Sequence, residues 1–413
     1  MPLQRFSILK GIYRPDVKIG RFLSALILSG VAMGLQRGAQ DNYLAEIVRI
    51  DAFERGIVEF FRELPGFMVV FFLAWMYRFT ENKIFKTGLG LMAAGVTGFM
   101  LAQPGKIAVT ALLVIYSSGE HIVMPVRTSI SLDIAKKDKG GASLGITGAL
   151  GHGGHIAGYA LVSVAFALFA KTGLEKIVQF KTVFAVSAAL AIAAFMVSFA
   201  LKESGQKVSR RRFYFDKKFF KYYMLEIFYG ARKQIFITFA PYVLILNYGA
   251  NAQVISLLLA VSALFAFIAS PLIGKLIDKA GYKIVMVGDT IILIVVCFLY
   301  GFSHRLFPAQ IAFYVVCVNY VLDAIISVAS MASNVYVQDI ASSQEEITAT
   351  VSTGISVNHV ISILIALTGG LMWKLAGIEL LFSFSAFLGL INTLYAATIK
   401  TRKHSPAKDM PTE

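Results

Sequence analysis

The sequence is poor in charged residues and has almost no cysteine. Asp, Glu, Lys and Arg make up 15% of its 413 residues, whereas soluble domains contain about a quarter. The two cysteines, Cys297 and Cys317, lie in apolar stretches, so neither a disulfide framework nor a cysteine-based metal site can be built. A P-loop and an HExxH motif are also missing, which argues against ATP hydrolysis and zinc-protease chemistry. We therefore expect no enzymatic activity and no cofactor.

Apolar residues dominate the chain instead. They form 57% of it, its mean hydropathy is +0.70, and stretches of the roughly 20 residues that cross a membrane recur throughout. Twelve such spans are expected, at residues 22–44, 56–77, 85–103, 107–128, 143–169, 182–201, 222–246, 253–273, 283–302, 308–332, 350–372 and 379–399. The sequence therefore predicts an all-α membrane protein with twelve transmembrane helices.

A basic segment divides these spans into two sets of six. Residues 202–221 carry eight Lys or Arg, far more than any other connection between spans. We expect an N-terminal six-helix half at residues 1–201, a cytoplasmic linker at 202–221, and a C-terminal six-helix half with a short cytoplasmic tail at 222–413.

The positions of the basic residues predict the orientation. With the N-terminus inside, the inner segments hold 26 of the 39 Lys and Arg, the outer loops 8 and the spans 5. By the positive-inside rule, both termini are cytoplasmic, and the first 21 residues are a tail rather than a cleaved signal. The net charge of +15 then reflects topology and contact with membrane lipids. We expect an integral protein of the bacterial inner membrane, with no nucleic-acid partner.

Ionisable residues are unevenly distributed among the spans. Spans 1, 2, 4, 5, 7, 10 and 11 contain them, whereas spans 3, 6, 8 and 12 have none in their interiors and span 9 has only Asp289. Because a charged group facing lipid costs several kcal/mol, the charged spans should surround a polar interior. The third, sixth, ninth and twelfth helices should be peripheral.

Two sets of six helices, with every third helix peripheral, resemble the major facilitator superfamily, whose substrate cavity lies between two pseudo-symmetric halves. The segment SPLIGKLIDKAGYK, residues 270–283, resembles the signature loop of that family. Its matching residues are Gly274, Asp278, Gly281 and Lys283. The resemblance implies a cytoplasmic gate latch at this loop, and an ordinary tight turn is the alternative. The corresponding loop of the first half, residues 73–85, lacks the Gly and the Asp.

Carboxylates within the spans are candidates for proton coupling, because neighbouring arginines and burial shift a carboxyl group's proton affinity in opposite directions. The candidates are Glu59, Glu63, Glu120 and Asp323. Glu59 and Glu63 lie with Arg62 in the expected outer third of span 2, at the depth of Arg37 and Asp41 in span 1. We expect one charge cluster across these two spans. It could relay protons, or it could be a static network that holds the helices together.

Cations and amides within the spans are candidates for substrate binding. They are Arg37, Arg62, Arg232, Lys233, Asn319, Asn358 and His359. Adjacent residues on a helix point about 100° apart, so only one of Arg232 and Lys233 needs to face a cavity. Pairing of these cations with Glu226 or Asp323 is the alternative to an anion site. The amides and His359 could equally form interhelical hydrogen bonds.

Small residues at four-residue spacing predict a close contact between the halves, since they let two helix backbones approach each other. In span 5 they are Gly141, Gly145, Gly154 and Gly158, and in span 8 they are Ser262, Ala266 and Ser270. His152 and His155 of span 5 are too few ligands to define a metal site, so no metal is expected.

These features together predict a secondary active transporter that works by alternating access. Five cations within the spans favour a small anionic or zwitterionic organic solute, and the carboxylates favour proton coupling. The expected partners are the solute, protons and membrane lipids, and the expected state is a monomer. An exporter of lipophilic compounds or a lipid flippase is the first alternative. A membrane receptor or scaffold that does not transport is the second, supported by the incomplete first-half loop.

Overall fold

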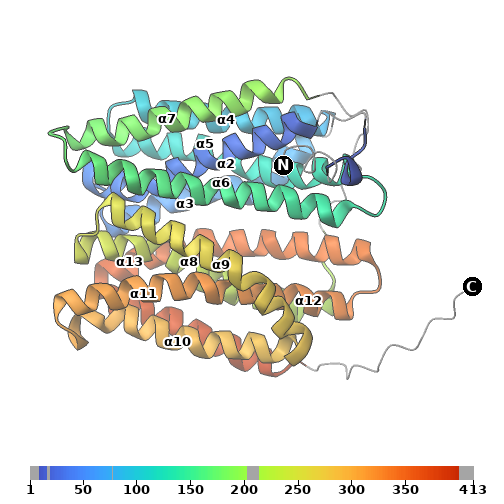
Figure 1. Cartoon of the computed structure of the whole chain (residues 1–413). Coiled ribbons are helices and arrows are strands. Elements are labelled where there is room, and N and C mark those ends of the chain that lie inside the picture. The colour runs from blue at the N-terminus through green and yellow to red at the C-terminus, as the bar shows by residue number, and fades with distance from the viewer. Residues whose placement is uncertain (1–8, 16–18, 77, 202–213, 400–413) are drawn as a thin grey trace, which may run out of the picture.

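A computed structural model of the chain describes residues 9–15, 19–76, 78–201 and 214–399. This part of the chain is almost entirely helical and contains no β-strand (Figure 1). Its long helices are α2 (Ile19–Asn42), α3 (Ala52–Trp75), α4 (Glu81–Leu101), α5 (Lys106–Asp133), α6 (Gly140–Phe169), α7 (Lys176–Ser198), α8 (Phe220–Tyr248), α9 (Ala252–Ala280), α10 (Tyr282–Leu306), α11 (Ala309–Ser327), α12 (Met331–Ile340) and α13 (Gln344–Ala397).

Every expected span corresponds to a helix or to part of one. The eleventh and twelfth spans form α13, which is interrupted where Gly377 adopts a φ of 80°. The tenth span is α11 continued by a short turn into α12. Within the described residues, nine helical segments are long and apolar enough to cross a membrane. Helices α3 and α8 are not among them, because both carry several charged residues. The all-α membrane architecture is thus confirmed.

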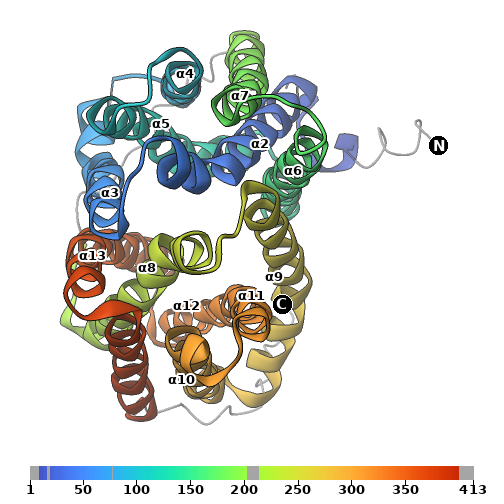
Figure 2. The ribbon, with the colours of Figure 1, turned by 90° about the vertical axis from the view of Figure 1, so that its left-hand side faces the viewer.

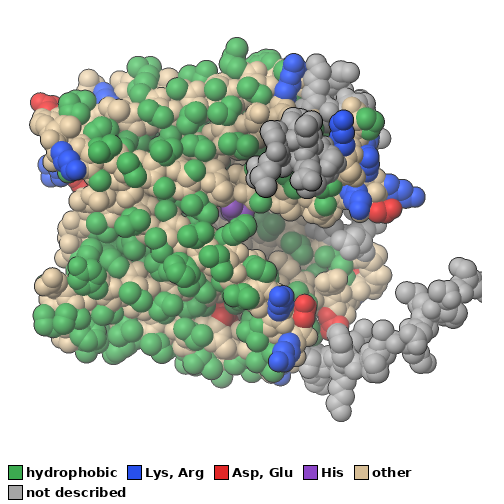
Figure 3. Space-filling model, viewed as in Figure 1, with side chains coloured by type: hydrophobic (Ala, Val, Ile, Leu, Met, Phe, Trp, Pro, Cys, Tyr) green, Lys and Arg blue, Asp and Glu red, His purple; other side chains and the backbone are tan. Residues whose placement is uncertain are grey.

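The surface agrees with a membrane setting. In Figure 3 hydrophobic side chains cover the middle of the visible face, while most Lys, Arg, Asp and Glu lie toward its two ends. We call the end that carries the ion pairs Lys106–Glu54 and Lys176–Glu46 the outer end, following the charge-based orientation. The opposite end, which carries the pair Arg14–Asp133, is the inner end.

The helices form two halves that lie side by side (Figures 1 and 2). Helices α2 to α7 make up the first half and α8 to α13 the second. In Figure 2, α4 and α7 lie on the side of the first half that faces away from the second half. Helix α10 and the dark red last part of α13 lie on the corresponding far side of the second half. These are the third, sixth, ninth and twelfth spans, as the distribution of ionisable residues predicts.

The halves contact each other through α3 with α13 and α6 with α9, and the close contacts cluster toward the outer end. The Asn42 amide donates to the Ala250 carbonyl at 2.9 Å, and the Ser163 hydroxyl donates to the Gln253 carbonyl at 3.1 Å. The Lys374 ammonium lies 4.9 Å from the centre of the Phe53 ring. Toward the inner end, the visible face is hollowed between the halves (Figure 3). The chain is therefore closed at the outer end.

The glycines of α6 do not form the predicted contact with α9. Gly154 and Gly158 pack against Gly30 and Gly34 of α2, within the first half, while Gly141 and Gly145 face open space. Helices α6 and α9 do meet, through the Ser163 hydrogen bond described above. The prediction of this helix pair was right, but its glycine interface was assigned to the wrong partner. Spacing alone shows that a helix face is flat and does not show which neighbour covers it.

Candidate functional site

A continuous chain of ion pairs runs through the first half from α2 into α3. Arg55 contacts Asp41 at 3.2 Å and Glu59 at 2.7 Å. Arg62 holds both oxygens of Glu59, at 2.6 and 2.8 Å, and also pairs with Glu63. Bidentate pairs of this kind fix the orientation of both side chains. The cluster expected across the first two spans is therefore present, and Glu59 is fully buried at its centre.

The helical repeat of α3 produces this alignment. Residues three and four apart share a helix face, so Arg55, Glu59, Arg62 and Glu63 point to the same side. Helix α3 begins at Ala52, a full turn before the expected start, and this brings Arg55 into the helix. It also moves the cluster inward, because Glu63 then lies near the middle of α3 rather than in its outer third.

The ion-pair chain continues into the second half. The Gln234 amide of α8 donates to Glu59 at 2.9 Å, and Nδ1 of His359 in α13 lies 3.0 Å from Glu63 Oε2. The ring of His121 in α5 lies against His359, with 5.0 Å between their centres. Carboxylates of the first half thus contact side chains of the second half deep within the bundle.

Arg37 does not belong to this cluster. It pairs with Glu120 of α5, and it also interacts electrostatically with Tyr159 of α6. Its side chain is 39% exposed, against 14% for Arg62 and 3% for Arg55. Tyr320 of α11, in the second half, interacts electrostatically with Tyr159. Arg37 is therefore a partly exposed cation whose neighbour Tyr159 interacts with the second half.

The two adjacent cations of α8 have different environments. Arg232 is 1% exposed and pairs with Asp289 of α10 at 3.4 Å, so its partner is neither Glu226 nor Asp323. Lys233 is half-buried, and its ammonium lies 5.9 Å from the centre of the Tyr229 ring. Within the described residues Lys233 has no carboxylate at ion-pair distance, and Glu226 is its electrostatic neighbour. Of the two cations, Lys233 is the one available to a ligand.

Asp323 of α11 also lacks a partner in the described part of the chain. It is half-buried, no described donor bonds to its carboxylate, and its electrostatic neighbour is Arg232. The other three candidate carboxylates, Glu59, Glu63 and Glu120, are each paired with an arginine. Asp323 is therefore the candidate whose protonation would break no ion pair in this arrangement.

The amide candidates are engaged in contacts within the second half. The Asn319 side chain donates to the Val315 carbonyl of its own helix at 2.7 Å. The Asn358 amide lies 3.4 Å from Glu226, whose other oxygen accepts from Ser333. The Asn358 contact fits the expected alternative of interhelical hydrogen bonds, whereas the Asn319 bond lies within its own helix. Only His359, among the polar candidates of the eleventh span, contacts the first half.

The signature-like loop is a tight connection between α9 and α10. Gly281 joins the two helices with a φ of 88°, a conformation that favours glycine. Asp278 is exposed in the last turn of α9 and caps no helix, Lys283 is half-buried, and Gly274 faces open space. Tyr282 donates to Asp339 at the end of α12, at 2.8 Å. Among the described residues, this polar contact of the loop is thus with the second half.

The inner end of the second half has its own polar contacts. Glu346, at the start of α13, accepts from Tyr214 at 3.0 Å and from Lys218 at 3.1 Å. The backbone N–H of Ser342, followed by Lys218 and Tyr214, holds the pKa of the Glu346 carboxyl below its ordinary value. Most of the predicted linker, and the whole predicted tail after Ile399, lie outside the described residues.

The pentapeptide GASLG at residues 141–145 has the spacing of a serine-hydrolase nucleophile motif, which requires a sharp strand-to-helix turn around the serine. Here the segment lies within the first turns of α6. Ser143 is fully buried, and its hydroxyl donates to the Ser131 carbonyl at 2.7 Å. The local structure therefore does not fit a nucleophile.

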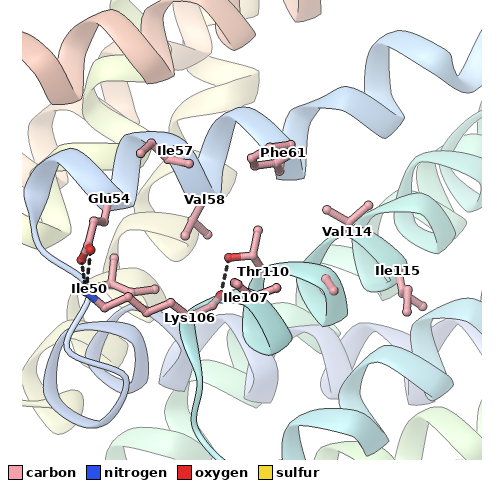
Figure 4. A pocket seen from close by; sticks show the side chains of 11 residues that line it. Ile50, Glu54, Ile57, Val58, Phe61, Lys106, Ile107, Thr110, Val114 and Ile115 are labelled. Carbon is pink, nitrogen blue, oxygen red and sulfur yellow. Dashed lines mark hydrogen bonds and ion pairs between the residues drawn. The ribbon is translucent and has the colours of Figure 1, made fainter.

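An apolar groove of about 690 Å³ lies between α3 and α5 (Figure 4). Ile57, Phe61 and Val114 are among the side chains that line it, and the Glu54–Lys106 ion pair lies at its outer edge. All its residues come from the first half. The groove is therefore separate from the interface between the halves, and its apolar wall suits contact with a lipid chain.

Sequence reasoning missed three members of the central network. Arg55 was counted as a loop residue, although Asp51 and Glu54 form a reciprocal capping pair that starts α3 early, with distances of 2.8 and 3.0 Å. That D-x-x-E pattern is a recognisable helix start. The sequence did not mark Gln234 as a member of the network, because a single amide side chain on a helix can make many kinds of hydrogen bond. His121 was not selected from the sequence, because a lone histidine within a span is often only a packing residue.

Comparison with known proteins identifies the fold. Residues 222–412 match the family model of the Major Facilitator Superfamily, and no curated protein sequence matches the chain significantly. The match covers the C-terminal half, which contains the signature-like loop. The family resemblance is thereby confirmed, although no subfamily is identified.

Solved structures with the same fold cover both halves. The nucleoside transporter NupG is 14% identical, with a TM-score of 0.70, and the comparison covers 92% of this chain and 99% of that one. A bacterial homologue of the iron transporter ferroportin is 11% identical (TM-score 0.72; 92% and 97% covered). A D-xylose–proton symporter is 14% identical (TM-score 0.70; 92% and 96% covered). At these identities the likeness shows the fold alone.

Proposed function

We propose that this chain, which has the fold of the major facilitator superfamily and matches the family model over its C-terminal half, is a secondary active transporter. It moves a small anionic or zwitterionic organic solute, and protons drive the movement. One observation carries this proposal. The two halves are closed toward the outer end, and between them some charged side chains are accessible and only partly paired, whereas others are buried in ion pairs.

The solute site is built around Arg37 and Lys233, one from each half. Arg37 is more exposed than the other arginines of the network, and Lys233 has no carboxylate at ion-pair distance in the described residues. A guanidinium binds carboxylate or phosphate with two parallel hydrogen bonds, and an ammonium adds a second positive charge. Glu120, the partner of Arg37, can accept from a solute amine, which extends the range to zwitterions.

Asp323 is the proposed proton carrier. It is half-buried and unpaired within the described part of the chain, so it can gain and lose a proton without breaking an ion pair. Glu59, Glu63 and Glu120 serve a structural role in this arrangement, because protonation of any of them would break an ion pair with an arginine. The static network that the sequence left open as an alternative is thus adopted for these three carboxylates.

The way the halves meet supports alternating access. In this arrangement the outer ends are in contact and the polar contact of the signature-like loop is with the second half, which corresponds to an inward-open state. Opening of the outer end must break the contacts of α3 with α13 and of α6 with α9. The loop with Asp278 would then dock as a latch. Among the similar structures, the ferroportin homologue is also described as inward-facing.

The test is uptake into proteoliposomes of purified protein under an imposed pH gradient. The solutes come from a panel of carboxylates, amino acids, nucleosides and sugars, which includes solute classes named for similar structures. Asp323→Asn should abolish gradient-driven accumulation while leaving exchange of solute across the membrane intact, because exchange needs no net proton movement. Asp278→Asn is the matched control for the loss of one carboxylate, and it should slow both modes equally.

Accumulation that persists unchanged in Asp323→Asn would contradict the proton-carrier role. If no solute moves in the wild type but lipids scramble between leaflets, the flippase alternative replaces this proposal. The apolar groove between α3 and α5 gives that alternative little support, because it lies outside the interface between the halves. If solutes bind but never move, the receptor alternative replaces the transporter.

A further inference from the structure

Three potential metal ligands from three helices converge at the centre of the bundle. They are Glu63 of α3, His121 of α5 and His359 of α13, and one ligand atom from each lies within 4.8 Å of the others. We propose that they form a binding site for a divalent first-row transition-metal ion, with Zn²⁺ as the reference ion. This site is distinct from Arg37, Lys233 and Asp323, and it goes beyond the proposed transport of an organic solute.

The orientation of His121 is already that of a metal ligand. Its Nδ1 lies 2.8 Å from the Ser117 carbonyl oxygen, which can only accept a hydrogen bond, so Nδ1 carries the proton. The Nε2 lone pair is therefore free. The Ser117 hydroxyl lies 3.1 Å from the same Nδ1 and donates its own hydrogen to the Arg62 carbonyl at 2.6 Å. Support of this kind from a backbone carbonyl is characteristic of histidines that bind metals.

Gly66 provides the space in which the ligands meet. A Cβ atom added at this position would lie 2.7 Å from both His121 Nε2 and His359 Nδ1. The two nitrogens therefore point toward the same side of α3, where glycine has no side chain. Glu63, one helical turn earlier, brings Oε2 to 3.0 Å from His359 Nδ1. Ligands of a tetrahedral ion lie about 3.3–3.6 Å apart, so small side-chain movements suffice to complete the site.

The charge of the surroundings favours a cation. Asp41, Glu59 and Glu63 carry three negative charges against the two positive charges of Arg55 and Arg62, so the cluster that includes Glu63 has one net negative charge. Two imidazoles and one carboxylate suit zinc and other first-row divalent ions, with open positions for water. They do not suit Mg²⁺ or Ca²⁺, which prefer oxygen ligands.

Metal binding would connect the two halves, because His359 belongs to the second half and the other two ligands to the first. On binding, the His359 proton must leave Nδ1 and reside on Nε2. The ion therefore stabilises the arrangement described here over any arrangement in which α3 and α13 separate.

The experiment is a Zn²⁺ titration of the detergent-purified full chain, made without a polyhistidine tag and treated with a chelator. We expect one ion per chain and a rise in melting temperature, with no rise for Mg²⁺. Glu63→Gln, His121→Gln and His359→Gln should each weaken Zn²⁺ binding by at least about tenfold. The control is His152→Gln, which changes a histidine of α6 whose ring centre lies 6.1 Å from that of His155, and it should bind like the wild type.

Two further measurements keep the proposal testable if a ligand variant does not fold. Gly66→Ala retains all three ligands but fills the space between them, so it should also lose Zn²⁺ binding. Co²⁺ bound to the wild type should give the visible absorption bands of a nitrogen-ligated, low-coordinate ion. The proposal is overturned if the wild type binds no Zn²⁺, if the three ligand variants bind normally, or if His152→Gln removes the binding. None of these readouts depends on solute transport.

Discussion

Arginines compensate the negative charge of the buried carboxylates in the first half. Glu59 receives hydrogen bonds from Arg55, Arg62 and Gln234, so all its charge is compensated although none of it is exposed. The sequence predicted that Glu59, Arg62 and Glu63 would cluster, because their spacing places them on one face of a helix. It could not predict that Arg37 would turn to Glu120 instead, since that choice depends on how α2 packs against α5.

Glu59→Gln should therefore destabilise the protein strongly. The substitution leaves two buried arginines with too little negative charge, and breaking a buried pair costs about 3–5 kcal/mol. Glu54→Gln, in the same helix, is the control. Its pair with Lys106 is partly exposed, and such pairs contribute about 0–1 kcal/mol. Thermal unfolding of the purified variants measures the difference, and equal melting temperatures would show that the network is not structural.

Helices approach each other most closely where a glycine faces a neighbouring backbone. A Cβ atom at Gly56 of α3 would lie 2.3 Å from the Ala366 carbonyl oxygen of α13 and 3.2 Å from Gly370. This contact lies at the outer end and joins the two halves. Hydropathy predicted the spans within a few residues, but the α3–α13 contact was not foreseen, because Gly56 fell at the edge of the expected span and Gly370 had no recognisable partner.

Gly56→Ala should favour separation of the outer ends, because the added methyl group has no room in the closed arrangement. Gly148→Ala in α6, where nothing lies within 4 Å, is the matched control. Spin labels at positions 176 and 305, both exposed near the outer end, would report the separation by pulsed electron paramagnetic resonance in a variant without Cys297 and Cys317. We expect a longer-distance population only in Gly56→Ala. The same distances in both variants would contradict the role of this contact.

The number of helices and their arrangement follow from two patterns in the sequence. Apolar stretches gave the twelve spans, and the scarcity of ionisable residues in every third span gave the peripheral helices. The polar interior was harder to predict, because its key pairs join the halves. Glu63 meets His359 across 296 positions in the sequence, and that contact depends on how two separately folded sets of helices dock.

Pairing and position explain why the charged residues of this chain are tolerated within a membrane. Ionisable groups at this depth are stable only when they face protein or water. Most of them are paired inside the first half, and three partly exposed ones, Arg37, Lys233 and Asp323, lie on the interior helices α2, α8 and α11.

The most direct test of the proposed solute site is a thermal-stability screen of the purified protein with carboxylates, amino acids, short peptides, nucleosides, sugars and lipophilic cations. A ligand that binds the native state raises the melting temperature. We predict that anions or zwitterions raise it, that Lys233→Gln and Arg37→Gln each remove the shift, and that Arg37→Lys retains part of it. Arg37→Gln alone leaves the Glu120 carboxylate without its partner. The double variant Arg37→Gln, Glu120→Gln removes that carboxylate as well and serves as the control. Stabilisation by lipophilic cations or lipids alone, or an anion shift that survives both substitutions, would contradict the account.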